Sequence, residues 1–291
     1  MTQGTADLPA EKSGRTPADT ERRFNMSPAT GNLTRRQLLR QLSLITGGCF
    51  LGLLGASRGF AAAARLPGLY RPPRIALIID DIGYNRSLAR HFVQLNETLT
   101  FSVLPQLAYS RALAQELHQQ GYEVMLHQPM EPYDNCCDPG PGALFVGDNS
   151  KQIKKVLQAN IGDIPFAKGV NNHMGSKFTS ARHEIAEALK VIQSRKLFFV
   201  DSITSSRSLA HATAKRYQMP TAHRNVFLDN DREETAILRQ LARLKKHAIM
   251  HGRAIGIGHP YPETARAIGR FSRQLKRSNV SLVSVSEILF G

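Results

Sequence analysis

From residue 74 to the end of the chain, short apolar runs alternate with longer amphipathic segments, and this alternation limits the folds open to the chain. The runs have the length and composition of buried strands, and the segments between them carry apolar residues three and four positions apart, as helices do. The expected strands are 75–79, 101–104, 122–126, 168–171, 197–200, 225–228, 254–258 and 280–285. Alternating strands and helices predict a parallel sheet covered by helices. Seven or eight such units favour a closed or nearly closed barrel, with an open doubly wound sheet as the alternative.

Polar side chains that can bind metals or transfer protons follow most of these strands. They are Asp80, Asp81, His127, Asn172, His173, Asp201, Asp229 and His259. In a parallel barrel the carboxyl ends of the strands meet on one face, so we expect these side chains to converge. Each also has an ordinary explanation, because Asp201 or Asp229 could cap a helix and a single histidine is often structural. Carboxylates and imidazoles gathered at one rim favour a functional site.

The adjacent carboxylates of Asp80 and Asp81 repel each other unless a cation lies nearby. Carboxylate oxygen together with imidazole nitrogen suits zinc, and such a site would also accept manganese, cobalt or nickel. In "LHQPMEP", His127 and Glu131 lie four residues apart, and the two prolines favour a loop over a regular helix. The residues therefore predict a divalent metal site, with zinc favoured, at which Glu131 is either a ligand or a surface charge.

The motifs "IDDIG", "HQPMEP", "GVNNHMGS", "VDS" and "IGHPYPET" occur in this order along the chain. Together they resemble the polysaccharide deacetylases of carbohydrate esterase family 4, and especially the divergent polysaccharide deacetylase branch. The resemblance covers about residues 74–290. It implies a distorted (β/α)7-8 barrel of the polysaccharide deacetylase type.

The resemblance also implies roles for the matching residues. Asp80 corresponds to the general base of the family, Asp81 to the metal-binding aspartate, and His127 to the first histidine of the metal motif. Glu131 stands where the family has its second histidine, so either Glu131 or His173 completes the metal site, and we slightly favour His173.

Two further roles follow from the same resemblance. His259 matches the late histidine that acts as general acid, and Asp201 would orient or tune the charge of a neighbour. The Arg-Pro motif of the family is not evident in this chain.

The function that the resemblance implies is a metal-dependent hydrolase that removes N-acetyl groups from an envelope polysaccharide, acting on linear amide C–N bonds in carbohydrate metabolism. The expected partner is an N-acetylated glycan, with peptidoglycan as one candidate. The departures at Glu131 and at the arginine motif keep an alternative open. This alternative is a catalytically silent, deacetylase-like protein of the cell envelope that binds a glycan or a metal.

The first part of the chain has the features of an export signal. Residues 1–33 are polar and expected to be disordered. In residues 34–65, "TRRQLLR" resembles a twin-arginine signal, and a weakly apolar stretch with an A-x-A-like cleavage region near 61–64 follows it. Residues 66–73 are expected to be a Pro-rich linker to the barrel domain at 74–291. These features predict a periplasmic or envelope protein that contacts the membrane only through the signal, if the signal stays uncleaved.

The formal net charge of +15 raises the question of a nucleic-acid partner. The basic residues are scattered, many of them lie in the first 74 residues, and no RNA-binding or zinc-finger motif accompanies them. We therefore expect no nucleic-acid partner. Cys136 and Cys137 are assigned a structural role. Four histidines outside the strand-end pattern are interpreted as structural or solvated, namely His211, His223, His247 and His251.

Overall fold

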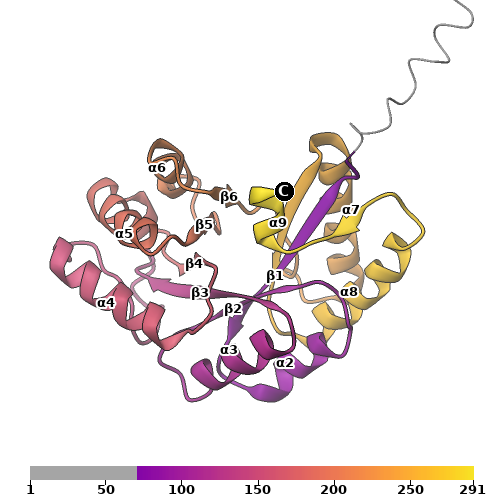
Figure 1. Ribbon diagram of the computed structural model, residues 1–291, viewed down its shortest axis with the longest axis horizontal. Helices are drawn as coiled ribbons and strands as arrows, with labels where there is room; N and C mark the ends of the chain where they lie inside the picture. The colour runs from indigo at the N-terminus through magenta and orange to yellow at the C-terminus, as the bar shows by residue number, and fades with distance from the viewer. Residues whose placement is uncertain (1–70) are drawn as a thin grey trace, which may run out of the picture. The chain divides into compact units, whose positions relative to one another are not determined.

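The computed structural model describes residues 71–291, which form a curled parallel sheet surrounded by helices (Figure 1). The strands are β1 (Arg74–Ile82), β2 (Thr100–Val103), β3 (Glu123–Met130), β4 (Gly169–Met174), β5 (Phe198–Asp201), β6 (Thr221–His223), β7 (Val226–Phe227), β8 (Arg253–Gly258) and β9 (Ser281–Leu282). Their order is β6-β5-β4-β3-β2-β1-β8-β7, and β9 pairs with β1. All of these pairings are parallel.

The sheet curls into an incompletely closed barrel. Its two edge strands, β6 and β7, follow each other in the chain, separated by Arg224 and Asn225, and within residues 71–291 they do not pair with each other. The prediction of a distorted (β/α)7-8 barrel is confirmed, and the open doubly wound sheet is not adopted. The expected strand 225–228 shortens to β7, β6 was not expected, and 280–285 contains only the two-residue strand β9.

Helices lie between successive strands and cover the outside of the sheet (Figure 1). They are α2 (Arg86–Val93), α3 (Ser110–Gln119), α4 (Ser150–Asp163), α5 (Arg182–Ser194), α6 (Ala210–Arg216), α7 (Glu234–His251), α8 (Pro262–Leu275) and α9 (Val285–Phe290), with a 3₁₀ turn at Phe178–Ser180. Local sequence sets several of their ends. Asn149 and Gln152, for example, form a reciprocal capping box at the start of α4.

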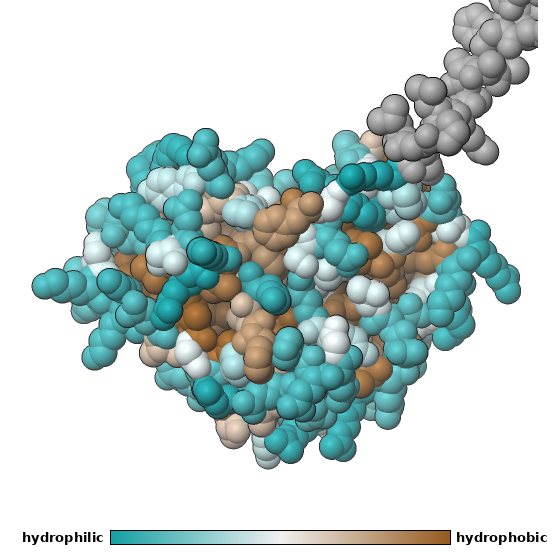
Figure 2. All heavy atoms as spheres, viewed as in Figure 1, coloured by the Kyte–Doolittle hydropathy of each residue, from teal (hydrophilic) through white to brown (hydrophobic). Residues whose placement is uncertain are grey.

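Side chains of β1 alternate between two apolar cores, as the period of a strand requires. Ile75, Leu77 and Ile79 pack in the larger core beneath the helices, whereas Ala76 and Ile78 pack inside the barrel. The inner core also takes in Val285 and Ile288 of α9, so this short helix fills the end of the barrel. In Figure 2 hydrophilic residues surround the face shown, and hydrophobic residues lie toward its middle.

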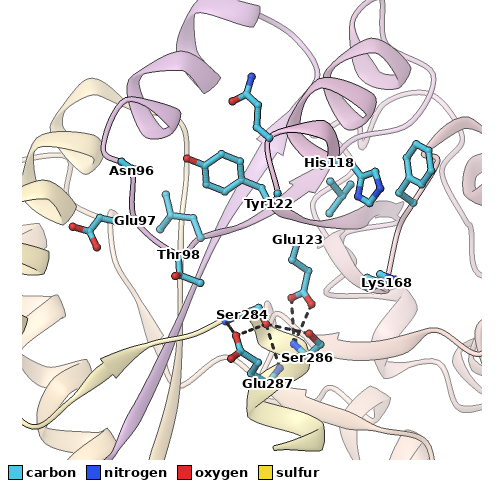
Figure 3. A pocket seen from close by; sticks show the side chains of 15 residues that line it. Asn96, Glu97, Thr98, His118, Tyr122, Glu123, Lys168, Ser284, Ser286 and Glu287 are labelled. Carbon is cyan, nitrogen blue, oxygen red and sulfur yellow. Dashed lines mark hydrogen bonds between the residues drawn. The ribbon is translucent and has the colours of Figure 1, made fainter.

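Glu123, at the first residue of β3, fastens α9 to the barrel (Figure 3). Its Oε1 accepts hydrogen bonds from the backbone N–H of Val285 (2.8 Å) and of Ser286 (3.2 Å), and from the Thr100 hydroxyl (3.0 Å). A carboxylate at this position satisfies the free N–H groups of the first turn of α9 and interacts favourably with the positive end of the helix dipole.

The expectations for the start of the chain lie largely outside the described residues. The disordered extension (1–33), the export signal (34–65) and most of the linker (66–73) precede residue 71. Residues 71–73 have no regular secondary structure. Among residues 71–291, no helix combines the length and the apolar composition that crossing a membrane requires.

Candidate active site

Asp80 and Asp81 lie near the carboxyl end of β1, and both carboxylates are directed toward the same mouth of the barrel. Asp80 follows Ile78 by two residues, so the side chains of both point to the same face of the strand. Asp80 is buried, with 3 % of its surface exposed. The register between β1 and β2 shifts between Ile79 and Ile82, and Asp81 adopts a left-handed backbone with φ of 57°. Aspartate tolerates this conformation better than most residues. The irregularity prevents the two side chains from pointing to opposite faces, as neighbours in a regular strand would.

Three of the predicted metal ligands lie together. Asp81 Oδ1 is 3.2 Å from His127 Nε2 of β3 and 3.0 Å from His173 Nδ1 of β4. The two imidazole nitrogens are 3.2 Å apart. Within residues 71–291, this is the one group of at least three His, Cys, Asp or Glu side chains whose donor atoms all lie within 4.8 Å of one another.

The hydrogen bonds of Asn171 show which tautomer His127 adopts. Asn171 Nδ2 donates to both oxygens of Asp80, at 2.9 and 3.1 Å, so Asn171 Oδ1 is the acceptor for His127 Nδ1 at 2.9 Å. The Ser102 hydroxyl donates to the same oxygen. His127 therefore carries its proton on Nδ1, and its Nε2 presents a lone pair to Asp81.

This arrangement fits a divalent cation. Asp81 Oδ1 is buried and has no hydrogen-bond donor, and the Nε2 lone pair of His127 faces it. Electron-rich atoms at such a distance repel each other unless positive charge lies between them. Burial disfavours the charged form of Asp81. Without a cation, the protonated forms of His127 and His173 would take its place, and they outweigh burial and hold the pKa of this carboxyl far below its usual range. A carboxylate oxygen and two imidazoles are a suitable ligand set for zinc and similar metals.

Asp80 lies beside this group without joining it. Its Oδ2 is 3.5 Å from His127 Nε2, and both of its oxygens accept hydrogen bonds from Asn171. Burial raises the pKa of Asp80 above its usual value, although the charges of His127 and His259 oppose the rise. A buried carboxylate with a raised pKa is suited to accept a proton.

His259 lies on the other side of Asp81, with its Nε2 3.8 Å from Asp81 Oδ2. Its Nδ1 is 2.9 Å from Asp229 Oδ1. Asp229 Oδ2 accepts the backbone N–H of His259 at 2.6 Å and the Thr264 hydroxyl at 2.8 Å. Burial disfavours the charged imidazole, but the hydrogen bond to Asp229 and the nearby carboxylates outweigh it and raise the pKa of His259 to about 9. The ring is therefore equipped to hold a proton and donate it from Nε2.

Asp229 is a residue of the site that the sequence analysis named only as a strand end or helix cap. Helix α7 begins at Glu234 with Glu233 at its N-cap, so Asp229 does not cap it. Asn171 was likewise missed, because it was assigned to the strand 168–171 itself, as its last residue, and not to the polar residues that follow it. Their signal in the sequence was position alone, since both stand at or beside the carboxyl end of an expected strand.

Glu131 does not join the metal-ligand group. Its Oε1 forms a salt bridge with Lys177 Nζ at 2.7 Å, and its Oε2 accepts the backbone N–H of Val146 at 2.8 Å. Both contacts hold the loop after β3 in place. Where the sequence left Glu131 and His173 as alternatives, the structure brings His173 to Asp81 and turns Glu131 to these other partners.

Asp201 is buried at the end of β5 and organises the following loop. Its carboxylate accepts hydrogen bonds from the Ser208 hydroxyl (2.7 Å), the N–H of Ile203 (2.9 Å) and the N–H of His211 (3.1 Å) at the start of α6. The N-cap residue of α6 is Leu209, so Asp201 does not cap the helix in the way the alternative proposed, although its carboxylate accepts one N–H of the first turn. Asp201 favours the charged forms of two neighbours, Arg224 and His211. Burial lowers the pKa of each, and Asp201 opposes that lowering.

The profile of the divergent polysaccharide deacetylase family matches residues 77–289. The chain therefore belongs to this family. It is 30 % identical to the uncharacterized protein YibQ of Escherichia coli over 231 residues, which are 79 % of this chain and 72 % of YibQ.

Solved structures agree with the fold. The uncharacterized protein ATU2773 of Agrobacterium tumefaciens is 27 % identical, has a TM-score of 0.71, and is matched over 77 % of this chain and 92 % of its own. A putative cellobiose-phosphate cleavage protein of Enterococcus faecalis has a TM-score of 0.57 at 11 % identity, over 76 % of this chain and 100 % of its own, which is a likeness of fold alone.

Proposed function

We propose that this protein is a metal-dependent hydrolase that removes N-acetyl groups from an envelope polysaccharide. The observation that carries the proposal is the buried Asp81 Oδ1, which has no hydrogen-bond donor and faces His127 Nε2 and His173 Nδ1. A base, Asp80, and a protonated imidazole, His259, flank it on two sides. Membership of the divergent polysaccharide deacetylase family supports the reaction class.

Asp81, His127 and His173 would hold the metal. When bound, the metal would supply Lewis acidity, which lowers the pKa of water and polarises an amide carbonyl. Asp80 would accept the proton of the attacking water, whose oxygen bonds to the acetyl carbon. His259, kept protonated by Asp229, would donate its Nε2 proton to the nitrogen as the C–N bond breaks. The products are acetate and a free amine on the sugar.

Acetate release and metal content, measured on the same full-length preparation, test this proposal. We expect one zinc or similar ion per chain by elemental analysis, and acetate release from N-acetylglucosamine oligomers or peptidoglycan. Asp80→Asn and His259→Gln should lose acetate release and keep their metal, because neither residue belongs to the ligand group. Glu131→Gln is the matched control. A protein that binds metal and glycan but releases no acetate would favour the silent binding protein, and a protein without metal or glycan affinity would contradict both.

We further propose that the twin-arginine-like segment exports the protein to the periplasm. The chain offers its own control, because Arg22 and Arg23 form a second adjacent arginine pair outside the "TRRQLLR" motif. Replacing Arg35 and Arg36 with lysines should retain the protein in the cytoplasm in a cell-fractionation experiment. The same change at Arg22 and Arg23 should leave export intact. Equal export of both double variants would contradict the proposal.

A further inference from the structure

Four of the histidines outside the strand-end pattern come together in one pocket. His211 of α6, His223 of β6, and His247 and His251 of α7 line a cavity of about 330 Å³. The cavity lies beside the break in the sheet, because the β6 and β8 residues that line it flank the short edge strand β7. None of these side chains belongs to the metal-ligand group.

The charged residues that line this histidine pocket are basic. They are Lys215 of α6 and Arg253 of β8, and no aspartate or glutamate lines the cavity. The Arg253 guanidinium donates to the carbonyl of Ile288 at 3.0 Å, which holds it at the wall. Asp201 is the acidic side chain whose charge favours the protonated form of His211. Its carboxylate already accepts three hydrogen bonds from other groups.

The imidazoles lie in two close pairs. The ring centroids of His211 and His223 are 4.8 Å apart, and those of His247 and His251, one helical turn apart, are 4.3 Å apart. Of the four rings, His211 alone has a side-chain hydrogen bond within the described chain, at 3.4 Å to the Thr221 hydroxyl. The remaining rings leave their nitrogens available to a ligand.

Protonation of His211 and His247 is opposed by burial and by neighbouring basic side chains. Burial, His223 and Lys215 lower the pKa of His211. Burial, His251 and His223 lower the pKa of His247. An anion in the cavity would remove this conflict, because it would supply the countercharge that the walls lack and would allow the rings to become donors.

We propose that the histidine pocket binds a tetrahedral oxyanion, either a phosphate or sulfate group, free or carried by a small organic molecule, and that the rings take up protons as it binds. A metal ion fits less well for two reasons. No three of these rings bring donor atoms within 4.8 Å of one another, and Lys215 and Arg253 repel a cation. The apolar wall at Ile288 and Leu289 could accommodate the body of a larger ligand.

Calorimetric titration of the full-length protein with sulfate tests the proposal, because sulfate keeps its charge between pH 7.5 and pH 5.5. We expect sulfate to bind about tenfold more tightly at pH 5.5 than at pH 7.5, because uptake of about half a proton on binding changes the Kd by about tenfold over two pH units. His223→Gln with His247→Gln should abolish this gain. His91→Gln with His183→Gln, which changes two exposed histidines outside the pocket, should retain it.

A second probe distinguishes the source of the anion. Glucose 6-phosphate should bind more tightly than sulfate if the pocket also holds an organic body, and equally if it holds the anion alone. Sulfate binding that is independent of pH, or that persists unchanged in the His223→Gln/His247→Gln variant, would overturn the proposal. Zinc retained by an Asp81→Asn protein and lost on further replacement of His223 and His247 would also overturn it, in favour of a metal site. The exposed single variant His251→Gln provides a second test, with a smaller loss expected, if the double variant folds poorly.

Discussion

At the scale of single residues, Asn171 separates the roles of the two carboxylates at the end of β1. Its amide donates to Asp80 and its carbonyl accepts from His127 and Ser102. One side chain thus positions the proposed base and sets the tautomer of a proposed metal ligand. Such partners usually affect metal affinity as well as orientation.

Asp81→Asn should remove the metal while leaving the fold intact. Asparagine has the same shape and also tolerates the left-handed backbone found here, so the loss is one of charge and ligand quality. We expect metal affinity to fall by more than about 100-fold, because changes to residues that merely support a ligand already cost about 10–100-fold. Equilibrium dialysis with elemental analysis measures this, and Glu131→Gln should match the native protein. Native metal content in Asp81→Asn would contradict the assignment.

Two substitutions at Asn171 should separate its two contacts. Asn171→Ala loses both, and we expect metal affinity to fall by about 10–100-fold. Asn171→Asp can still accept the His127 proton but no longer donates to Asp80, so it should bind metal more tightly than the alanine variant and still hydrolyse slowly. Metal titrations and acetate release on the same samples would show this split. Equal metal affinities of the two variants would argue against the tautomer role.

At the scale of elements, the barrel depends on contacts at the strand ends opposite the metal-ligand group. Glu123 fixes the first turn of α9, whose Val285 and Ile288 fill the inner core. Between β4 and β5 the packing is close, because any side chain at Gly169 would meet the ring of Phe198. Both features support the curvature that brings β1, β3 and β4 together at the site.

Glu123→Ala should destabilise the protein by about 1–2 kcal/mol, the usual range for losing a helix-capping group. The N–H of Ser286 would lose its acceptor and that of Val285 would keep only the longer bond to the Thr100 hydroxyl (3.3 Å), so the first turn of α9 would fray. Chemical denaturation measures the free energy of unfolding. Glu187→Ala is the control, because its ion pair with Lys190 is a surface pair between neighbouring turns and should change stability by less than about 0.5 kcal/mol. Equal effects of the two changes would contradict the capping role.

Gly169→Ala and Gly162→Ala should have opposite effects. At Gly169 the new methyl group would collide with Phe198, and overpacking of this kind costs about 1–3 kcal/mol. At Gly162, inside α4, a methyl group meets nothing within 4 Å, so the better helix propensity of alanine should stabilise by about 0.5–1 kcal/mol. Paired unfolding curves provide the comparison. If Gly169→Ala left the free energy of unfolding unchanged, the neighbouring strands would have to move apart without a loss of stability.

At the scale of the whole domain, the histidines with shifted pKa values divide between the two sites, with opposite effects on stability. In the metal-free protein, His259 and His127 have raised pKa values, so their contribution is present at low pH and is lost as the pH rises through their folded-state pKa. His211 and His247 have lowered pKa values. Their contribution is present above the ordinary histidine pKa of about 6.5 and is lost as the pH falls toward the folded-state pKa.

The histidine pocket should therefore weaken the folded state in mild acid. Between pH 7.5 and pH 5.5, His247→Gln should lose less stability than the native protein does, because one of the rings that resist protonation is gone. The difference between variant and native unfolding curves isolates this effect from the opposite contributions of His127 and His259. His183→Gln serves as the control. If the free energy of unfolding fell more steeply with falling pH in His247→Gln than in the native protein, the lowered pKa assigned to His247 would be contradicted.

Much of the fold could be predicted from the chain, because apolar periodicity and strand-helix alternation are local properties. Helices α3 (from Ser110) and α4 (from Ser150) lie in amphipathic segments between expected strands, as the alternation predicts. The short edge strands could be predicted only in part: β6 was not expected and the expected strand 225–228 shortens to β7, because both depend on pairing with β5 and β8 as well as on their own residues. At the candidate site, strand-end position pointed to the group of Asp81, His127 and His173, but not to the roles of Asn171 and Asp229.

The sequence by itself determined the alternation of elements, the family motifs and the face on which polar strand ends gather. Only the tertiary structure decided which of those polar residues meet. It turned Glu131 to Lys177 and His173 to Asp81, paired His259 with Asp229, and collected four distant histidines into one pocket. The physical reason is that periodicity specifies the face of each strand or helix. Contact between side chains of different strands depends on register and curvature, which the whole barrel sets.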